Sequence, residues 1–449
     1  MAVADRRKGL EQEFFLVDEA GVLSNRADEF LQRCQDAAEA AGRSPDYFAA
    51  EWVKSMIELQ TRPVYSVTDL AKEYLSNLKL ALQVGREMGL RLYPLSTYPM
   101  HVMPVIRKKL WYHVQIRTVG YDRFLHAGRC TGTHLHLDLP EGTIDSRVGV
   151  SYNATPAARE ELLNTYNLAT ALDTALIALS RACPFYEGRG MNVSAHTVHY
   201  RGSDTFGWEG VYTHLQPVGG LQPYAASTEE LVELQFARYY AWLEAMDNAG
   251  VERHLFSEAG GNLLKAAWNR VRLNSIGTVE MRGTDSNYPE VILAIAALVY
   301  SAADRVRREN LTVLPAKEAR TFEVSGNKLF VPDFKYLDGD LLYAVVTEGV
   351  KHPAVRAYLD SLLEFVVQDG GEGAHYLAKL RSSLGEYQTT EADILQEFTT
   401  ATGEISRDEG LRLVLQSCDK LEEQVSSLYE QPPLAVLEAI NAGKKSKVK

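Results

Sequence analysis

The chain has 449 residues, of which 46% are hydrophobic and 24% are charged. This composition excludes a disordered, collagen-like or coiled-coil protein, and the length allows one elaborate catalytic domain or two modest domains. The formal net charge of -12 argues against nucleic-acid or anionic-membrane partners, because such binding depends on clustered Lys and Arg.

The four cysteines show no CxxC spacing, so neither a disulfide framework nor a cysteine-based zinc site is expected. The N-terminus lacks the apolar core of a secretory signal, and the most apolar window, residues 291–303, is too short to span a bilayer. These features predict a cytoplasmic protein.

The first 140 residues predict alternating strands and helices. Residues 9–17 are rich in Phe, Leu and Val and end at a turn, which indicates a strand. Residues 26–42 predict a helix, and residues 56–61 predict a second strand that Pro63 ends. A capped helix follows from Ser66 to about residue 90. Residues 132–139 alternate between apolar and polar positions, as in a strand with one face on a core.

The remaining elements are mainly helical. Thr155 and Pro156 begin a long helix that reaches about residue 181, and a capping box begins another at residues 227–248. Residues 278–283 predict a strand and residues 291–306 a buried helix. A hairpin over residues 322–332 precedes mainly helical sequence.

Four of the predicted strands carry polar residues at positions i and i+2, which share one face of a strand. If the strands form one sheet, that face is too charged to bury without a cation or another charged ligand. Hard oxygen ligands favour Mg²⁺ or Mn²⁺, and magnesium commonly bridges to nucleotide phosphates. The pairs are Glu11 with Glu13, Glu58 with Gln60, His134 with His136, and Glu280 with Arg282.

Each pair also has a simpler interpretation. A single Glu-x-Glu is typical of a solvent-facing strand, and Glu280 with Arg282 could form a surface ion pair. His134 and His136 could bind the zinc of a hydrolase. The occurrence of four such strands in one chain favours a functional site.

Five motifs, in this order, resemble those of the second family of glutamate-cysteine ligases, also called carboxylate-amine ligases. The resemblance covers residues 9–310. The motifs are Gly-Leu-Glu-Gln-Glu at residues 9–13, Glu-Leu-Gln-Thr-Arg-Pro at 58–63, Gly-Thr-His-Leu-His-Leu at 132–137, Cys-Pro-Phe-Tyr-Glu-Gly-Arg at 183–189 and Val-Glu-Met-Arg-Gly-Thr-Asp at 279–285.

The resemblance implies an α+β fold of the glutamine-synthetase type, in which a curved antiparallel sheet has helices on its convex face. Residues 1–312 would form the catalytic domain, and residues 313–449 a mainly helical region packed on it. It also implies ATP as co-substrate and Mg²⁺ or Mn²⁺ as cofactor. An acyl phosphate would form on glutamate and be attacked by an amine, with cysteine the leading acceptor. The sequence does not decide whether the protein forms a homo-oligomer.

The resemblance also assigns roles to individual residues. Metal ions would be held by Glu11, Glu13, Glu58, His136 and Glu280. His134, His136 and Arg282 would contact the nucleotide, while Arg282, Glu280 and Glu58 would act in catalysis. Asp285, as a substrate-site residue, would orient Arg282 or the amine, or would instead cap a helix before Pro289. Apart from the resemblance, Arg189 and Arg201 are candidates for binding the carboxylate of an amino-acid substrate, because a forked guanidinium suits bidentate binding; the alternative for each is a surface arginine.

The chain departs from the family pattern at two places. It has Ser96-Thr97-Tyr98-Pro99-Met100 where relatives often carry Gly-Thr-His-Pro, and Asp138 replaces a glycine after the His-x-His strand. These changes place the acceptor pocket in doubt. Two other functions therefore stay open: a metal-dependent hydrolase that uses His134 and His136, and a non-catalytic nucleotide-binding relative.

Overall fold

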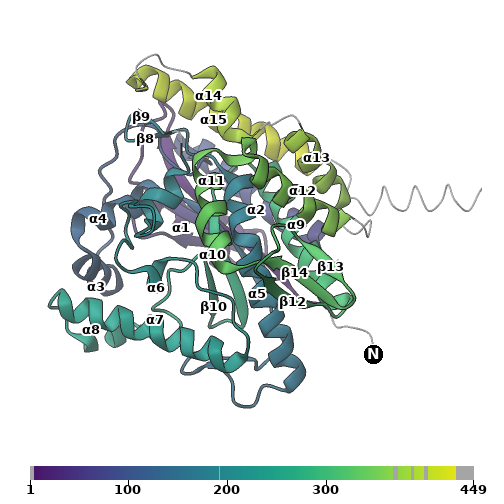
Figure 1. The fold of residues 1–449 in the computed structure, drawn as a ribbon. Helices are drawn as coiled ribbons and strands as arrows, with labels where there is room; N and C mark the ends of the chain where they lie inside the picture. Colours follow the sequence, from purple (N-terminus) through teal and green to yellow (C-terminus); the bar gives the residue numbers. More distant parts are fainter. Residues whose placement is uncertain (1–4, 192, 368–372, 386–388, 399–402, 431–449) are drawn as a thin grey trace, which may run out of the picture.

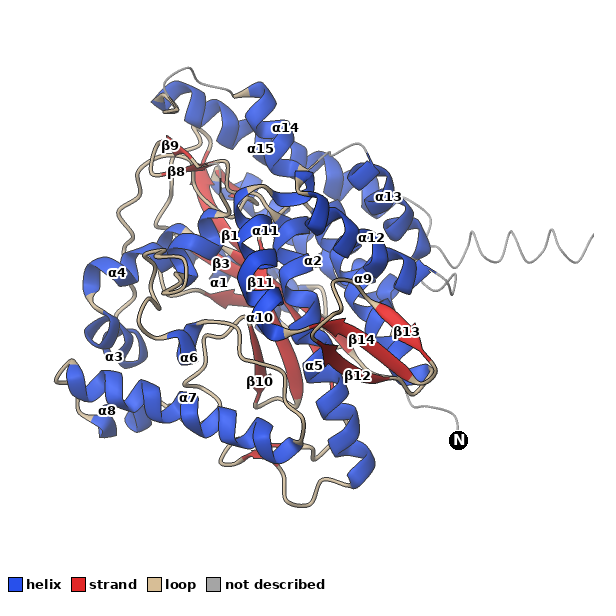
Figure 2. Cartoon of the chain, in the orientation of Figure 1, coloured by secondary structure: helices blue, strands red, loops and turns tan. Residues whose placement is uncertain are grey.

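A seven-stranded antiparallel sheet forms the centre of the fold in the computed structural model (Figures 1 and 2). The model describes residues 5–191, 193–367, 373–385, 389–398 and 403–430. Its strand order is β10-β11-β5-β1-β3-β2, and β4 pairs with the far end of β1. The strands are β1 (Lys8–Asp18), β2 (Phe48–Ala50), β3 (Met56–Gln60), β4 (Leu90–Tyr93), β5 (Gly132–Asp138), β10 (Val271–Asn274) and β11 (Thr278–Asp285).

The long strand β1 shows why the two faces of the sheet differ. Leu10, Phe14 and Leu16 point to one face and belong to the larger hydrophobic core. Glu11 and Glu13 point to the opposite face, since side chains alternate along a strand. Beyond Glu13 the second face also becomes apolar, where the strand contributes to a separate core cluster.

Helices cover the face that carries the larger core. Contacts join α5 to β11, α9 to β5, and α2 to both β1 and β3. Local sequence explains their limits: Ser66 caps α2, Gly89 ends it in the left-handed conformation, and Pro289 occupies the first turn of α9. The helices of this layer are α1 (Ala27–Ala40), α2 (Val67–Met88), α5 (Pro156–Ser180) and α9 (Pro289–Arg308).

Shorter helices and loops pack over the other face. Side chains from α3, α4, α7 and α8 join the second core cluster with Phe15 and Val17 of β1. Figure 1 shows α7 and α8 side by side at the lower edge of the molecule. The elements are η1 (Pro45–Tyr47), α3 (Leu110–Val119), α4 (Tyr121–Leu125), η2 (His126–Arg129), β6 (Ile144–Asp145), β7 (Gly149–Val150), β8 (Phe185–Tyr186), β9 (Arg189–Gly190), η3 (His196–Arg201), α6 (Gln216–Gly219), α7 (Thr228–Asn248) and α8 (Arg253–Glu258).

The C-terminal elements pack on the helical layer. Contacts join α12 and α13 to α9, and α15 to α2 and β4. The boundary at residue 312 stays a prediction, and residues 431–449 of the predicted region lie outside the described residues. The elements are β12 (Thr312–Ala316), β13 (Glu323–Ser325), β14 (Lys328–Pro332), α10 (Phe334–Tyr336), η4 (Leu337–Leu341), α11 (Leu342–Thr347), η5 (Gly349–Lys351), α12 (Pro353–Val367), α13 (Ala374–Gly385), α14 (Thr390–Glu397) and α15 (Arg407–Glu430).

The predicted α+β class is confirmed: a central antiparallel sheet has helices on its apolar face. Further helices pack over the other face, and the remaining described strands form three small separate sheets. Every strand and helix named in the sequence analysis occurs, within a few residues of its predicted bounds. The short strands β2, β4 and β10 were not predicted. None of the helices that the structure describes combines the length and apolar character needed to cross a membrane.

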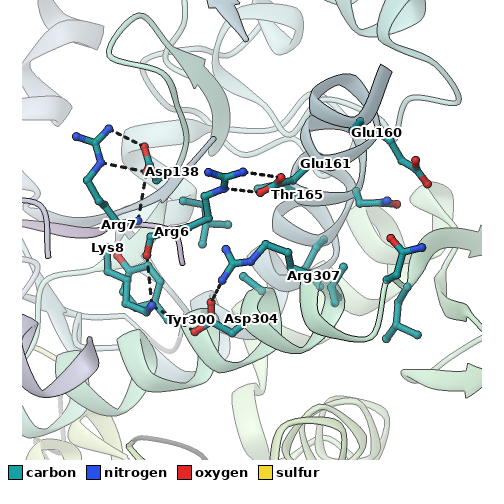
Figure 3. Close-up of a pocket in the computed structure, with 18 residues that line it drawn as sticks. Arg6, Arg7, Lys8, Asp138, Glu160, Glu161, Thr165, Tyr300, Asp304 and Arg307 are labelled. Atoms are coloured by element: carbon teal, nitrogen blue, oxygen red, sulfur yellow. Dashed lines mark hydrogen bonds and ion pairs between the residues drawn. The ribbon is translucent and has the colours of Figure 1, made fainter. Parts of the chain in front are cut away.

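Ion pairs anchor the start of β1 to the helical layer (Figure 3). Arg6 pairs with Glu161 of α5, and Lys8 lies 3.3 Å from Asp304 of α9. The hydroxyl of Tyr300, also on α9, accepts a hydrogen bond from the Gly9 amide at 3.1 Å and donates one to the Gly9 carbonyl. These contacts hold the start of β1 in place up to Gly9, two residues before Glu11.

Another ion pair, formed by Arg181 and Glu391, joins the end of α5 to α14. Both side chains are 7% exposed. We expect Glu391→Gln to lower the free energy of unfolding by about 3–5 kcal/mol, because it leaves the buried Arg181 guanidinium without its counter-charge. Denaturant unfolding would measure this. As a control, Asp145→Asn breaks the exposed pair with Arg147 and should not shift the midpoint; equal effects of both variants would contradict the expectation.

Candidate active site

The antiparallel register brings the charged pairs of the sequence together on one sheet face. Glu11 of β1 lies opposite His134 of β5, and Glu13 lies opposite Glu58 of β3. Glu280 of β11 lies opposite His136. Neighbouring strands are about 4.8 Å apart, so these side chains meet in one cavity.

Three overlapping groups of side chains in this cavity could each hold a cation. The ligand atoms within each group lie within 4.8 Å of one another. Glu11 belongs to two groups and Glu58 to two, so the groups form a continuous row across the sheet. The groups are Glu11–His136–Glu280, Glu11–Glu58–His134 and Glu13–Glu51–Glu58.

The cavity measures about 540 Å³ and has a polar floor and aromatic walls. The floor is the charged sheet face. Arg272 of β10 and Arg282 of β11 lie toward one edge of the sheet, whereas Glu51 lies toward the β2–β3 side. Lys265 also lines the cavity. The lining also includes Trp52, Lys109, Trp111, Tyr112, Gln115, Phe124, Ala127, Cys130, Tyr200, Tyr212, Ala259, Trp268 and Asn274.

Glu280 is the most tightly held carboxylate of the site. Arg272 bonds both of its oxygens, at 2.7 and 3.2 Å, and Asn274 and Arg282 bond it as well. Burial favours the protonated acid, but Arg272 and Arg282 outweigh it and hold the pKa of Glu280 well below its usual range. Glu280 is therefore ionised and fixed in place.

The remaining carboxylates divide into two kinds. Burial opposes ionisation of Glu11, but the imidazoles of His136 and His134 outweigh it and lower the pKa of Glu11. Burial and the charge of Glu51 raise the pKa of Glu13 to about 8, and burial with the charges of Glu11 and Glu51 raises that of Glu58 well above its usual range. These acids would hold protons unless a cation takes the place of the protons.

The donor set fits a hard divalent cation. It combines carboxylate oxygens with imidazole nitrogens, and the buried Nε2 atom of His136 lies 3.2 Å from a carboxylate oxygen of Glu11 within the Glu11–His136–Glu280 group. Burial, with Arg282, lowers the pKa of His134 to about 4, so this imidazole is neutral at pH 7.

Seven predicted residues converge at the site, and three lie elsewhere. Six of the seven line the cavity, and His136 lies beside it in the Glu11–His136–Glu280 group. Arg189 lies on the exposed hairpin strand β9 and is outside the lining. Arg201 is buried behind Arg282 and donates to its carbonyl at 2.8 Å. Asp285 accepts hydrogen bonds from the Ala182 amide and the Cys183 thiol. It neither contacts Arg282 nor caps α9, whose N-cap is Tyr288. The seven that converge are Glu11, Glu13, Glu58, His134, His136, Glu280 and Arg282.

Sequence reasoning missed Glu51, Arg272 and Asn274. Arg272 and Asn274 form another i and i+2 pair, in Val-Arg-Leu-Asn at residues 271–274, so the rule used for the other strands could have found them. Glu51 follows a strand of three residues, and only the pairing of β2 with β3 brings it near Glu58.

The sequence of the chain matches a known protein family. The model of glutamate-cysteine ligase family 2 matches residues 7–409. The chain belongs to this family. The resemblance predicted from the five motifs is thereby confirmed, and membership supports a carboxylate-amine ligase as the class of enzyme.

Two solved structures share the fold. A bifunctional glutathione synthetase from Pasteurella multocida is 15% identical with a TM-score of 0.56, over 94% of this chain and 53% of that one. The chain thus spans about half the length of that protein. A glutamate-cysteine ligase from Francisella tularensis, in complex with AMP, is 12% identical with a TM-score of 0.54, over 98% and 93%. A search of curated proteins finds no match.

Burial of Asp285 behind the site makes the free energy of unfolding depend on pH. Burial raises its pKa from 3.8 to about 7, against the opposing hydrogen bonds from Cys183 and Ala182. The folded protein keeps a proton that the unfolded chain releases, so this group's contribution to stability falls as pH rises from about 4 to 7, by at most ~1.4 kcal/mol per pH unit.

We therefore expect Asp285→Asn to flatten the dependence of the unfolding free energy on pH over this range. Denaturant unfolding at several pH values would measure it. His196, Arg181 and Glu391 also face this carboxylate, so the comparison must use the difference between variant and wild type. An identical slope in both proteins would contradict the expectation.

Proposed function

We propose that this protein is an ATP- and magnesium-dependent ligase that joins the side-chain carboxylate of glutamate to an amine, with cysteine as the leading acceptor. The observation that carries the proposal is the row of three overlapping acidic groups beside the fixed guanidinium of Arg282. That combination suits phosphoryl transfer, in which charge neutralisation and positioning supply most of the catalysis.

The chemistry has two steps. A carboxylate oxygen of glutamate attacks the γ-phosphorus of ATP, the bond to the bridging oxygen breaks, and ADP leaves. The amine nitrogen then attacks the acyl carbon, phosphate leaves with the former carboxylate oxygen, and the nitrogen loses a proton to form the amide. A carboxylate is a poor electrophile until its oxygen becomes part of a phosphate leaving group.

The residues of the cavity have distinct roles in this proposal. Glu11, Glu13, Glu51, Glu58, His136 and Glu280 would hold Mg²⁺ or Mn²⁺, which when bound neutralises phosphate charge. Arg282 would stabilise the migrating phosphoryl group, and His134, His136 and Arg282 would contact nucleotide. Arg272 and Asn274 would hold Glu280 rigid. The proposal gives Arg189, Arg201 and Asp285 no direct contact with substrate, because none of the three lines the cavity.

The alternative of a zinc hydrolase finds less support in the geometry. A hydrolytic zinc site with two histidines needs both on one ion. In the part of the chain that the structure describes, His136 and His134 fall in different groups, each with two carboxylates. The intact acidic groups and Arg282 also argue against a non-catalytic relative.

Turnover tests the proposal directly. The protein is incubated with ATP, Mg²⁺, glutamate and each of the common amines, ADP is quantified, and the condensation product is identified by mass. We expect ADP release that requires both glutamate and an amine. Absence of turnover with every amino-acid pair would overturn the proposal.

Variants of the Arg282–Glu280 pair test the site. We expect Arg282→Ala or Glu280→Gln to lower kcat at least ~100-fold, since the first removes positive charge placed at the reacting phosphoryl group and the second removes a metal ligand that also holds Arg282. The matched control is Arg147→Ala, which also breaks a pair between residues two positions apart, but on an exposed turn; its kcat should equal that of wild type. An active variant at 280 or 282 would remove that residue from the mechanism.

Glu51 tests the third acidic group. We expect Glu51→Gln to raise the Mg²⁺ concentration for half-maximal activity on the order of tenfold, because it removes one ligand of the Glu13–Glu51–Glu58 group. Glu39→Gln, on the exposed face of α1, is the control. A chelator should abolish turnover, and Mg²⁺ or Mn²⁺ should restore it. ATP-independent hydrolysis supported by zinc would instead favour the hydrolase.

A further inference from the structure

Arg201 is a buried cation with unusual partners. It is 3% exposed, and its two terminal nitrogens donate to main-chain carbonyls, one to Trp268 and one to Arg282 at 2.8 Å. Its Nε atom has no partner. Among the described residues, no carboxylate pairs with it. Glu13 and Asp173 are near enough to interact with its charge, but neither pairs with it directly, so the two main-chain carbonyls hold the guanidinium in position.

The carbonyl of Arg282 belongs to an irregular part of β11. The pairing of β11 with β5 shifts register between Met281 and Thr284, which places Arg282 in a bulge. A bulge re-aims the side chain that it carries. The amide of Arg282 donates to the Arg270 carbonyl at 2.6 Å, so Arg201 and Arg270 together hold both polar groups of this residue's main chain.

The bulge is closed from its other side by α5. A Cβ atom on Gly283 would collide with the carboxylate of Asp173, and that carboxylate lies 3.2 Å from Arg270. The bulge therefore cannot relax toward α5. Arg201 provides the contact from the opposite direction.

The position of Arg201 is itself fixed by local structure. It ends a π-helical turn, η3, and π-helical turns are frequent at functional sites. Gly202 follows with a φ of +75°, and a Cβ there would collide with Thr213. The Arg201 guanidinium also lies 4.4 Å from the ring centroid of Tyr200, which lines the cavity.

We propose that Arg201 is a positioning residue that fixes the β11 bulge, so that the Arg282 guanidinium is aimed at the reacting phosphoryl group. Arg201 itself does not line the cavity, and both of its terminal nitrogens are engaged. This role differs from the substrate-carboxylate binding expected from the sequence, and it rests on the proposed function of Arg282.

The test compares Arg201→Met and Arg201→Lys with wild type. We expect Arg201→Met to lower kcat about 100-fold, as a misplacement near 1 Å can do, while KM for ATP and for glutamate changes less than about threefold. Lysine carries all its donors on one nitrogen and lacks the planar fork that bonds two separate carbonyls, so Arg201→Lys should lose about tenfold in kcat.

Arg305→Met is the matched control. Arg305 is also buried, donates to the Phe365 carbonyl and lies over the Phe365 ring, but on α9 in the helical layer. It should lower the unfolding midpoint and leave kcat unchanged. A rise in KM for glutamate with kcat retained in the Arg201 variants would overturn the proposal in favour of substrate binding. An unchanged kcat and KM would overturn it in favour of a purely structural role.

A crystal structure of Arg201→Lys separates this proposal from the proposed function. We expect the Arg282 guanidinium to move away from Glu280. An unmoved Arg282 would overturn the positioning role, whether or not the wild type shows ligase turnover. A wild type without turnover overturns the ligase assignment alone.

Discussion

Repulsion among five carboxylates on one buried sheet face is the constraint on which the site depends. Glu11, Glu13, Glu51, Glu58 and Glu280 lie in a single cavity, and like charges at such separations cannot all ionise without compensation. The fold compensates unevenly. Arg272 and Arg282 neutralise Glu280, whereas Glu13, Glu51 and Glu58 have raised pKa values. Glu280 is therefore ionised and held in place, whereas burial favours the protonated forms of Glu13, Glu51 and Glu58.

The scaffold behind this face supplies the rigidity that such a site needs. Gln12 of β1 lies on the helical side of the strand, where its amide donates to the Asn287 carbonyl and its oxygen accepts from Tyr74. Asn287 in turn donates to the Ser180 carbonyl at the end of α5. Strand, helix ends and the loop before α9 are thus tied together directly beneath the carboxylates, and residues on regular elements hold their geometry better than residues on loops.

The sequence was sufficient for strands β1, β3, β5 and β11 and for their charged faces. It was not sufficient for the short strands β2, β4 and β10 or for the residues that surround the charged pairs. The two-residue spacing of Glu11 and Glu13 is enough to predict that they share one face of the strand. Glu51 does not, because its closeness to Glu58 depends on a hairpin between two short strands. Arg201 is a candidate substrate ligand because of its guanidinium group, and Asp285 because it ends one of the motifs. Their buried contacts depend on a bulge and on the end of α5, and neither feature has a local sequence signal.

The alternation along β1 also limits how this part of the chain can change. A single inserted or deleted residue between Lys8 and Glu13 would move every side chain on one side of the change to the opposite face of the sheet. The glutamates would then face the hydrophobic core, and leucine and phenylalanine would face the cation-binding groups. Substitutions at single positions can be tolerated one at a time, but a change of length here would disrupt folding and chemistry together. Any change of length from Arg6 onward would also disturb the ion pair between Arg6 and Glu161 of α5.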